Sequence, residues 1–406
     1  MVPMSHASPR VLRGRVVTPS AVVEDGVVAL DEDRISWVGR APDAPAELRD
    51  AVAAAAPTDG YLLPGLVDLH CHGGGGASFP EAEDTATART AVAEHLRHGT
   101  TSLVASLVTA APDVLRARTA TLVELAAAGE IAGIHFEGPF ISADRCGAQN
   151  PAAIQAPDAH LTRELLERGE GHVVTMTVAP EAPGVTGEGG VSQALVAGGA
   201  LPSFGHTVAR APEARDAVVE AGHLLAEEPR ARSARPTVTH LCNGMNPMHH
   251  REPGPIPEFL AAARAGRVVL ELIGDGTHLD PDFVRSVFEI AGRENVVLVT
   301  DAMAAAGMSD GDYVLGALAV TVLDGVARLT AGGAIAGGTA HLLDVVRTTV
   351  AGGVPLVDAV YAAATGPAVV LGDPAVGALE AGRRADVVVT DADLRPLEVV
   401  KNGVSI

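Results

Sequence analysis

The sequence predicts an α/β protein, a (β/α)8 TIM barrel with a small β-sandwich domain formed by the N- and C-terminal segments. Eight short apolar runs alternate with amphipathic stretches rich in Ala, Leu, Glu and Arg, which is the pattern of repeated strand and helix units. The segments outside these runs, 11–62 and 376–406, read as short strands joined by turns, without helices. An open two-layer sheet is the alternative, but such a sheet does not require eight units.

The predicted barrel strands are the eight apolar runs at 61–69, 100–108, 131–137, 172–179, 201–206, 236–241, 267–274 and 295–301. Helical patterns lie between most of them, such as those at 84–99 and 211–228. We therefore expect three segments. They are 1–62 as the N-terminal part of the small β domain, 63–374 as the metal-dependent catalytic barrel, and 375–406 as the C-terminal part of the small domain.

The charge balance excludes several classes of function. With 29 basic and 50 acidic residues the chain carries a formal net charge of -21, so it would repel the phosphates of nucleic acids and of anionic membranes. Lys401 is the single lysine. A Walker-type phosphate loop, a Schiff-base aldolase and a pyridoxal phosphate enzyme each need a lysine in the functional domain, so all three are excluded.

The termini and the cysteines indicate the compartment. Residues 1–12 lack the apolar core of a secretory signal, and no later stretch is long and apolar enough to span a membrane. Cys71, Cys146 and Cys242 are widely spaced and odd in number, which argues against a disulfide framework. We expect reduced thiols in a soluble, cytoplasmic protein.

The stretch VDLHCHGGGG at 67–76 is the first candidate site. Side chains alternate across a strand, so His70 and His72 would point to one side and Cys71 to the other. Both imidazoles could then bind one metal ion. Two histidines are too few for a complete metal site, and a strand that simply runs into a loose glycine turn is the alternative.

Metal-binding side chains also stand at the ends of other predicted strands. They are Glu137 after the third strand, His206 after the fifth, His240 in the sixth and Asp301 at the end of the eighth. Taken singly, each would be a hydrogen-bonded core histidine or a helix cap. The carboxyl ends of barrel strands share one face, however, so we expect these residues to join the paired histidines in a metal site.

The types of ligand indicate the kind of metal. Imidazole and carboxylate without thiolate favour a catalytic zinc, iron or manganese site with open coordination positions. The parity of their strands turns Cys71 and Cys242 away from the site, so we interpret both as packing residues. A carbamylated lysine bridges two metals in some barrels, but here only a carboxylate is present to do so. Glu137 is the natural bridge.

Ten motifs extend over nearly the whole chain: LLPGLVDLHCHG (62–73), GTTSLVASLVT (99–109), GIHFEGPFI (133–141), GAQNP (147–151), GHT (205–207), THLCNGM (239–245), HHREPG (249–254), GDGTHL (274–279), VTDAM (299–303) and GALEAGRRADVVV (377–389). With them the sequence resembles the amidohydrolase superfamily and, within it, the N-acetylglucosamine-6-phosphate deacetylases. The paired histidines and the last aspartate mark the superfamily. EGPF, THLCNGM, HREPG and GDGTHL together are specific for the sugar-phosphate deacetylases.

This resemblance implies a division of ligands and a reaction. Glu137, His206 and His240 would hold a primary metal, and His70, His72, Glu137 and Asp301 a second, with zinc expected and iron or manganese as alternatives. Water activated by the metal would attack the acetamide of N-acetyl-D-glucosamine 6-phosphate, giving D-glucosamine 6-phosphate and acetate. Asp301 would accept the proton of that water and deliver it to the departing amine.

The resemblance also implies contacts to the substrate. Arg251 would bind the phosphate, because an arginine fork suits a dianion and supplies positive charge that the chain otherwise lacks, and a surface arginine is the alternative. Gln149 would stabilise the oxyanion and His278 would contact the sugar. The other expected substrate-binding residues are Asn243, Gly244, Ala336 and Gly337. The family is typically homodimeric, so a homodimer is expected, and phosphate contacts from a partner subunit are open.

Two other functions remain open. One is a related amidohydrolase that acts on N-acetylgalactosamine 6-phosphate or on an N-acyl amino acid, since these motifs do not distinguish a sugar epimer. The other is a non-catalytic relative that keeps the barrel as an interaction scaffold. Such proteins tend to lose metal ligands, whereas all six ligand positions are filled here.

Overall fold

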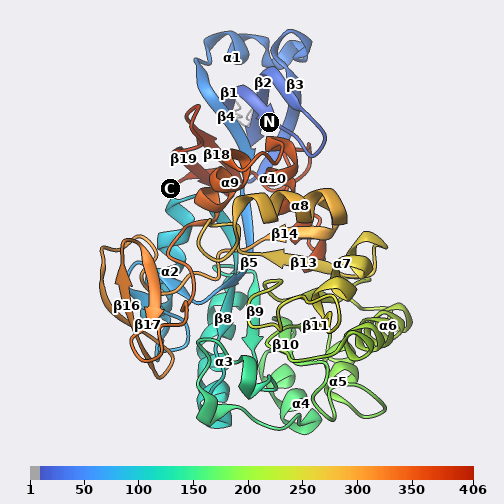
Figure 1. Ribbon diagram of the computed structural model, residues 1–406. Coiled ribbons are helices and arrows are strands. Elements are labelled where there is room, and N and C mark those ends of the chain that lie inside the picture. Colours follow the sequence, from blue (N-terminus) through green and yellow to red (C-terminus); the bar gives the residue numbers. More distant parts are fainter. Residues whose placement is uncertain (1–9) are drawn as a thin grey trace, which may run out of the picture.

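The computed structural model describes residues 10–406, and its largest unit is a parallel eight-stranded sheet curled into a nearly closed barrel (Figure 1). Its hydrogen-bonded order follows the order of the chain. The strands are β5 (Leu66–Cys71), β8 (Thr100–Leu107), β9 (Gly133–Glu137), β10 (Val173–Val178), β11 (Leu201–Phe204), β12 (Thr237–Val238), β13 (Val269–Leu272) and β14 (Val296–Leu298). The predicted (β/α)8 barrel is confirmed.

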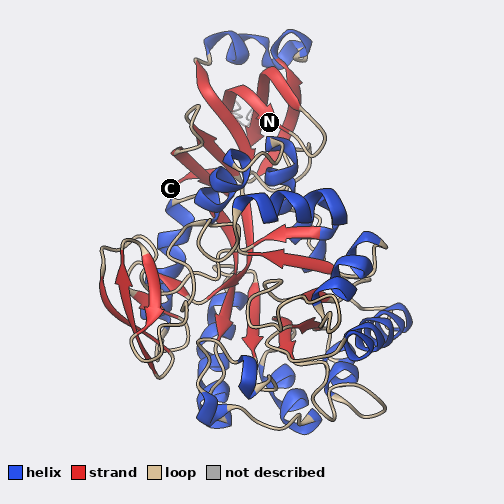
Figure 2. Cartoon of the chain, in the orientation of Figure 1, coloured by secondary structure: helices blue, strands red, loops and turns tan. Residues whose placement is uncertain are grey.

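Helices alternate with these strands and surround them (Figure 2). They are α2 (Thr85–Arg97), α3 (Pro112–Ala127), α4 (Ala159–Arg168), α5 (Val191–Ala197), α6 (Ala211–Glu227), α7 (Ile256–Arg264), α8 (Pro281–Ala291), α9 (Leu342–Ala351), α10 (Leu356–Ala363) and α11 (Thr365–Leu371). Every residue of the eight barrel strands is buried. Helices cover the outer face of the barrel and side chains fill its interior, so both faces of each strand are buried. This explains why the strands are continuous apolar runs in the sequence rather than alternating ones.

The small β domain joins the two ends of the chain, as predicted. It is one continuous sheet in the order β20-β19-β18-β4-β1-β2-β3, at the top of Figure 1. Its strands are β1 (Arg10–Val17), β2 (Val22–Asp31), β3 (Arg34–Arg40), β4 (Pro57–Pro64), β18 (Val387–Thr390), β19 (Pro396–Lys401) and β20 (Val404–Ser405). The central pairing of β4 with β18 connects the N-terminal and C-terminal segments.

The apolar run at 61–69 divides between the two units. β4 continues past the predicted boundary at residue 62, because Leu63 and Pro64 pair with Val388 and Val387 of β18. The barrel strand β5 begins only after Gly65. A single apolar run therefore contains the end of the central strand of one sheet and most of the first strand of another, which periodicity cannot reveal.

The prediction that segment 11–62 contains no helix is wrong. Two 3-10 turns (Ala41–Asp43 and Ala46–Leu48) precede α1 (Arg49–Ala54) in this segment. Leu48 and Val52 of this stretch pack with Val27 and Ala29 on one face of the sheet. The alanines around α1 have high helix propensity, and burial of this apolar contact stabilises so short a helix.

A three-stranded antiparallel sheet inserted between β14 and α9 was not predicted. It comprises β15 (Gly311–Leu315), β16 (Leu318–Leu323) and β17 (Val326–Leu329) and stands beside the barrel in Figure 1. Leu315 and Val320 pack with Met303 in a separate small core. A short hairpin of β6 (Gly73–Gly74) and β7 (Ala77–Ser78) also follows β5.

The barrel closes at residues just beyond β14 rather than within that strand. The backbone N–H of Asp301 donates to the carbonyl of His70 at 2.9 Å, and the next residue, Ala302, forms a parallel bridge with Cys71. Closure of the barrel therefore depends on residues of the candidate site.

Three further expectations concern the whole chain. The three cysteines are free within the described residues, as expected. From residue 10 onward, no helix has both the length and the apolar composition needed to cross a membrane. The expectation that residues 1–12 carry no secretory signal lies mostly outside the described residues.

Candidate metal centre and substrate cavity

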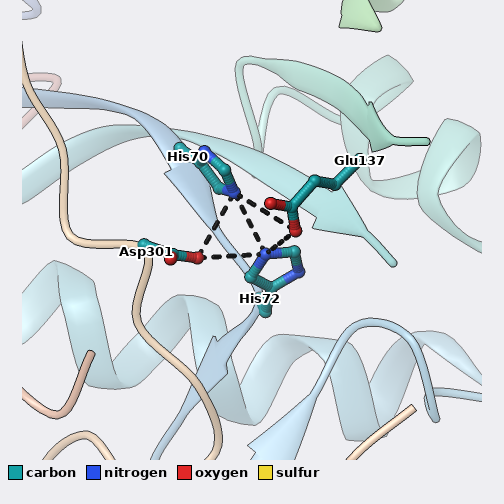
Figure 3. Close-up of side chains that lie close together, drawn as sticks. All are labelled: His70, His72, Glu137 and Asp301. Carbon is teal, nitrogen blue, oxygen red and sulfur yellow. Dashed lines mark hydrogen bonds and ion pairs between the residues drawn. The ribbon is translucent and has the colours of Figure 1, made fainter. Parts of the chain in front are cut away.

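The six expected metal ligands meet at the carboxyl ends of the barrel strands. They are His70, His72, Glu137, His206, His240 and Asp301, all within β5 and β9 or just after the ends of β5, β11, β12 and β14. All six are buried, from 0% exposure at His70 to 9% at Asp301. Figure 3 shows the carboxylates of Glu137 and Asp301 directed at the imidazoles of His70 and His72.

Three of these residues have a left-handed backbone. The φ angles are 46° at His206, 27° at His240 and 48° at Asp301. Residues other than glycine adopt this region rarely, at a cost of about 1–3 kcal/mol each. Each turn comes where a strand has just ended, so the chain leaves the extended conformation there and the side chain faces the centre of the site.

Glu137 belongs to two ligand sets at once. Its Oε1 lies 2.8 Å from Nε2 of His206 and 2.9 Å from Nε2 of His240. Its Oε2 lies 3.0 Å from Nε2 of His72, and Oδ1 of Asp301 is 3.2 Å from that same nitrogen. One carboxylate is thus shared between a set of two histidines and a set of two histidines and an aspartate.

The donor atoms of the two sets fit divalent cations. Nε2 of His70 faces Nε2 of His72 at 3.1 Å, and Nε2 of His206 faces Nε2 of His240 at 3.2 Å. Nitrogen lone pairs that converge at such distances repel each other unless a proton or a cation lies between them. Nitrogen and oxygen donors without thiolate are the set expected for zinc, iron or manganese.

Acceptors behind three of the imidazoles fix their orientation. Nδ1 of His72 lies 3.2 Å from the carbonyl oxygen of Ser106, and Nδ1 of His206 lies 2.7 Å from that of Arg145. Nδ1 of His70 lies 3.3 Å from a carboxylate oxygen of Glu271. Placing the ring proton on Nδ1 leaves the Nε2 lone pair free to bind a metal, which is the usual arrangement behind metal-bound histidines.

The carboxylates and imidazoles also perturb one another's ionisation. Burial alone would raise the pKa of Glu137, but the charge of His70 and the hydrogen bonds of His206 and His240 hold that pKa well below its usual range. Burial alone would lower the pKa of His72, but Asp301 and Glu137 raise it to about 9. The site is therefore strongly polarised, with its carboxylates held in the charged form that binds cations.

A cavity of about 240 Å³ opens directly onto these groups. Five of the six ligands contribute to its wall, together with Gln149, Asn243, Gly244, His278 and Gly337 from the expected substrate contacts. Loops that follow several strands meet here, as at the catalytic face of other barrels. The metal centre and most of the expected substrate-binding residues therefore form one site.

Gln149 is placed differently from its expected role. Its Oε1 accepts from the backbone N–H of Thr109 at 2.7 Å, and its Nε2 donates to Oε2 of Glu137 at 2.5 Å. The amide group that was expected to stabilise an oxyanion thus already holds the shared carboxylate in place. Gln149 is 3% exposed but lines the cavity, so it lies between Glu137 and the substrate space.

Comparison with known proteins identifies the family. The family model described as "Amidohydrolase family" matches residues 61–406. The chain belongs to the amidohydrolase family. Its match includes every expected metal ligand.

Several relatives of this amidohydrolase are amino-sugar phosphate deacetylases. The chain is 35% identical to N-acetylglucosamine-6-phosphate deacetylase of Homo sapiens, over 82% of this chain and 80% of the relative. It is 30% identical to N-acetylgalactosamine-6-phosphate deacetylase of Escherichia coli O157:H7, over 84% and 86%. A solved structure of an N-acetyl-D-glucosamine-6-phosphate deacetylase mutant from Mycobacterium smegmatis, in complex with N-acetyl-D-glucosamine-6-phosphate, matches with a TM-score of 0.87, 39% identity and coverage of 98% and 99%.

Two expected substrate residues do not line the cavity of this amidohydrolase in the described part of the chain. Arg251 is exposed on the loop between β12 and α7. Ala336 is fully buried and packs beneath the inserted sheet with Leu315 and Met303. A motif gives the position of a residue in the chain, but the distance of its side chain from the site depends on the path of a long loop.

Other residues of the site were missed. Leu315 in the unpredicted insert, with Ala334 and Ile335 in the loop that follows its last strand, supplies an apolar part of the wall. Glu271 interrupts the apolar run VVLELIG, and a lone carboxylate in a buried strand is a signal that sequence reasoning could have used. Asp275, three residues before His278, was likewise visible in the motif GDGTHL.

Asp275 and His278 form a buried pair at the cavity. Oδ2 of Asp275 is 2.7 Å from Nδ1 of His278, and Oδ1 accepts from the backbone N–H of His278 at 2.8 Å. Burial alone would lower the pKa of His278, but the hydrogen bond and charge of Asp275, with the charge of Asp301, raise it. The proton on the imidazole of His278, which lines the cavity, is thereby held more tightly than that of a free histidine.

We expect Asp275→Asn to lower the pKa of His278 below that of a free histidine, because burial would remain while most of the compensating charge is lost. The imidazole proton resonances of His278, followed by NMR as the pH is varied, measure this change. Asp282→Asn, which neutralises a carboxylate on α8 with 81% of its side chain exposed, is the control and should leave the titration in place. An unchanged titration in Asp275→Asn would contradict the account of this pair.

Proposed function

We propose that this amidohydrolase hydrolyses the acetamide of N-acetyl-D-glucosamine 6-phosphate to D-glucosamine 6-phosphate and acetate. The observation that carries the proposal is the carboxylate of Glu137, whose two oxygens face two separate ligand sets at the wall of one cavity. The similarity to a M. smegmatis deacetylase in complex with this sugar phosphate supports the choice of substrate. Comparing its turnover with that of other N-acyl compounds tests the proposal.

The metal ligands divide into two proposed sites. Glu137, His206 and His240 hold the primary ion, and His70, His72, Glu137 and Asp301 hold a second. Zinc is the proposed metal, with iron and manganese as alternatives, and one or two ions bind per chain. A divalent ion in such a site polarises the amide carbonyl and lowers the pKa of bound water, which supplies the nucleophile at neutral pH.

Asp301 is the proposed proton-transfer residue. Its side chain is 12% exposed, against 6% or less for the other five ligands, and it lines the cavity. Burial alone would raise its pKa, but the charge of His70 and the hydrogen bond of His72 lower it, so the group is a carboxylate at neutral pH. It can therefore accept the proton of the attacking water and then donate it to the departing amine.

The proposed phosphate ligand, Arg251, is supplied by a partner subunit. It is exposed outside the cavity wall of its own chain, on a loop where Met248 has 63% of its surface exposed. Methionine and arginine are both enriched in protein interfaces. A homodimer that covers this loop would bring the guanidinium to the neighbouring active site, and it would supply positive charge to a phosphate dianion.

A second candidate substrate is N-acetyl-D-galactosamine 6-phosphate. The E. coli relative that acts on this epimer shares 30% identity over most of both chains, so the same scaffold hosts both specificities. Parallel assays on the two sugar phosphates distinguish the candidates. If kcat/KM is higher for N-acetyl-D-galactosamine 6-phosphate, that compound becomes the proposed substrate. The three free thiols support the cytoplasm as the compartment of either reaction.

Replacing both His70 and His72 by alanine should lower the occupancy of the second metal site while the first site stays filled. Both nitrogens that face the second ion would be lost, whereas Glu137, His206 and His240 would remain. Elemental analysis of the purified protein measures the content. His223→Ala, on the outer helix α6, is the control and should keep the wild-type content. Equal loss of both ions would mean that the ligands are divided incorrectly.

Asp301→Asn should slow turnover by roughly two to four orders of magnitude with little change in KM, because proton transfer belongs to the transition state. Steady-state kinetics and metal content are measured on the same preparation. If the metal content falls in parallel with kcat, Asp301 acts mainly as a ligand and its proposed role in proton transfer is wrong.

Removing either Arg251 or the substrate phosphate should cost on the order of 2–4 kcal/mol in kcat/KM, and the two losses should not add, because they delete the same interaction. The measurement is a double cycle of wild type and Arg251→Ala, each assayed on N-acetylglucosamine with and without its 6-phosphate. Arg230→Ala, with 85% of its side chain exposed, is the matched control and should keep the preference for phosphate.

Two outcomes of this cycle would change the assignment. If Arg251→Ala weakens both substrates equally, the arginine is structural and the phosphate site lies elsewhere, for example at His278. If the wild type itself does not prefer the phosphorylated sugar, the sugar-phosphate proposal fails.

A further inference from the structure

We propose that Glu271 is a positioning residue that orients His70 and thereby sets the affinity of the second metal ion. The inference rests on the metal centre proposed above and adds a residue that belongs to neither ligand set. Glu271 lies in β13 with 2% exposure, and its Oε2 is 3.3 Å from Nδ1 of His70. The opposite nitrogen of the same ring faces His72 and Asp301.

Among the described ligand histidines, His70 has an orienting partner of a distinct kind. The Nδ1 atoms of His72 and His206 face main-chain carbonyl oxygens, and Nδ1 of His240 is buried with no partner among the described residues. Only the acceptor behind His70 is a side chain. Of these three orienting contacts, it is therefore the one that replacing the acceptor's side chain can remove.

The chemistry of the imidazole explains why a carboxylate there would matter. A neutral imidazole carries one ring proton, which can sit on either nitrogen. A carboxylate beside Nδ1 attracts that proton, so the lone pair of Nε2 is free for the metal and the ring is held in the orientation that binding requires. The partner also makes the ligand nitrogen more basic, which strengthens the bond to the cation.

The position of Glu271 predicts that replacing it weakens the second metal site and leaves the affinity of the primary site unchanged. Its carboxylate meets the side chain of His70, a ligand of the second site alone, whereas it reaches the primary site only through the backbone N–H of His240 at 3.4 Å. An unpaired carboxylate in a buried strand is strongly unfavourable. The contact with Nδ1 of His70 gives the buried carboxylate of Glu271 a hydrogen-bond partner.

The test is a metal titration of chelator-treated protein, in which zinc binding is followed by competition with a chromophoric chelator. For Glu271→Gln we expect the affinity of one site to fall by about 10- to 100-fold while the other keeps its wild-type value. Asp386→Asn is the control, because it neutralises a carboxylate that is 3% exposed and paired with Arg384 in the small domain, far along the chain from any ligand. Thermal unfolding of the metal-free proteins reports on the fold.

Three results would overturn the proposal. They are unchanged affinities in Glu271→Gln, equal weakening of both sites, and a loss of affinity matched by Asp386→Asn. If Glu271→Gln does not fold, Glu271→Asp keeps the charge but withdraws it from His70, and the same selective loss is expected. Wild-type protein that binds no metal would instead refute the metal centre itself, whereas two tight sites in both wild type and Glu271→Gln would refute only the role of Glu271.

Discussion

The structure of the site depends on one buried charge, the carboxylate of Glu137. At 3% exposure it would be strongly destabilising without compensation, since the effective penalty for burying an ion is several kcal/mol. Four imidazoles and the amide of Gln149 surround it. His70 and His72 share the end of β5, so the five partners come from four segments of the chain, and these four must converge on one carboxylate.

Closure of the barrel and assembly of the site use the same residues. Asp301 donates its backbone N–H to the carbonyl of His70, so the eighth segment joins the first where both supply ligands. The backbone N–H groups of His72 and Gly73 then both donate to the carbonyl of Ala302. A distortion that opens this seam would therefore also separate the second set of ligands, which ties the stability of the fold to the geometry of the site.

A chain of polar side chains crosses the barrel beneath the ligands. Oγ of Ser106 bonds both the backbone N–H of Cys71 and the imidazole of His135, which in turn bonds Thr177, and that hydroxyl bonds Thr239. These contacts link neighbouring strands and satisfy the buried polar groups. At three points a candidate ligand follows one or two residues later: His72 after Cys71, Glu137 after His135 and His240 after Thr239. Protein contacts therefore restrain these three positions. Such preorganisation is what a catalytic site requires.

The parts of this architecture that the sequence predicted are those with a local cause. Apolar runs marked all eight strands, and alternation along β5 placed His70 and His72 on one side, with Cys71 directed instead at His95. The carboxylate of Glu271 is visible in the run VVLELIG, but its pairing with His70 depends on contacts between distant segments, as do the left-handed turns at three ligands and the position of Arg251. No local pattern contains them. The insert was missed because its short strands, such as GDYVL, lie outside the expected repeat of strand and helix.

Chemistry and recognition are assigned to different parts of the chain. The ligands stand at strand ends, held by the barrel and by the polar contacts below them. Much of the remaining wall comes from loops and from the insert, including Asn243, Leu315 and Ile335. Loops tolerate substitution better than strands that carry a shared core, so the wall can change without disturbing the carboxylate of Glu137. Relatives that are 35% and 30% identical to this chain are named as deacetylases of N-acetylglucosamine 6-phosphate and of N-acetylgalactosamine 6-phosphate, and a wall that can vary independently of the ligand cluster is compatible with both.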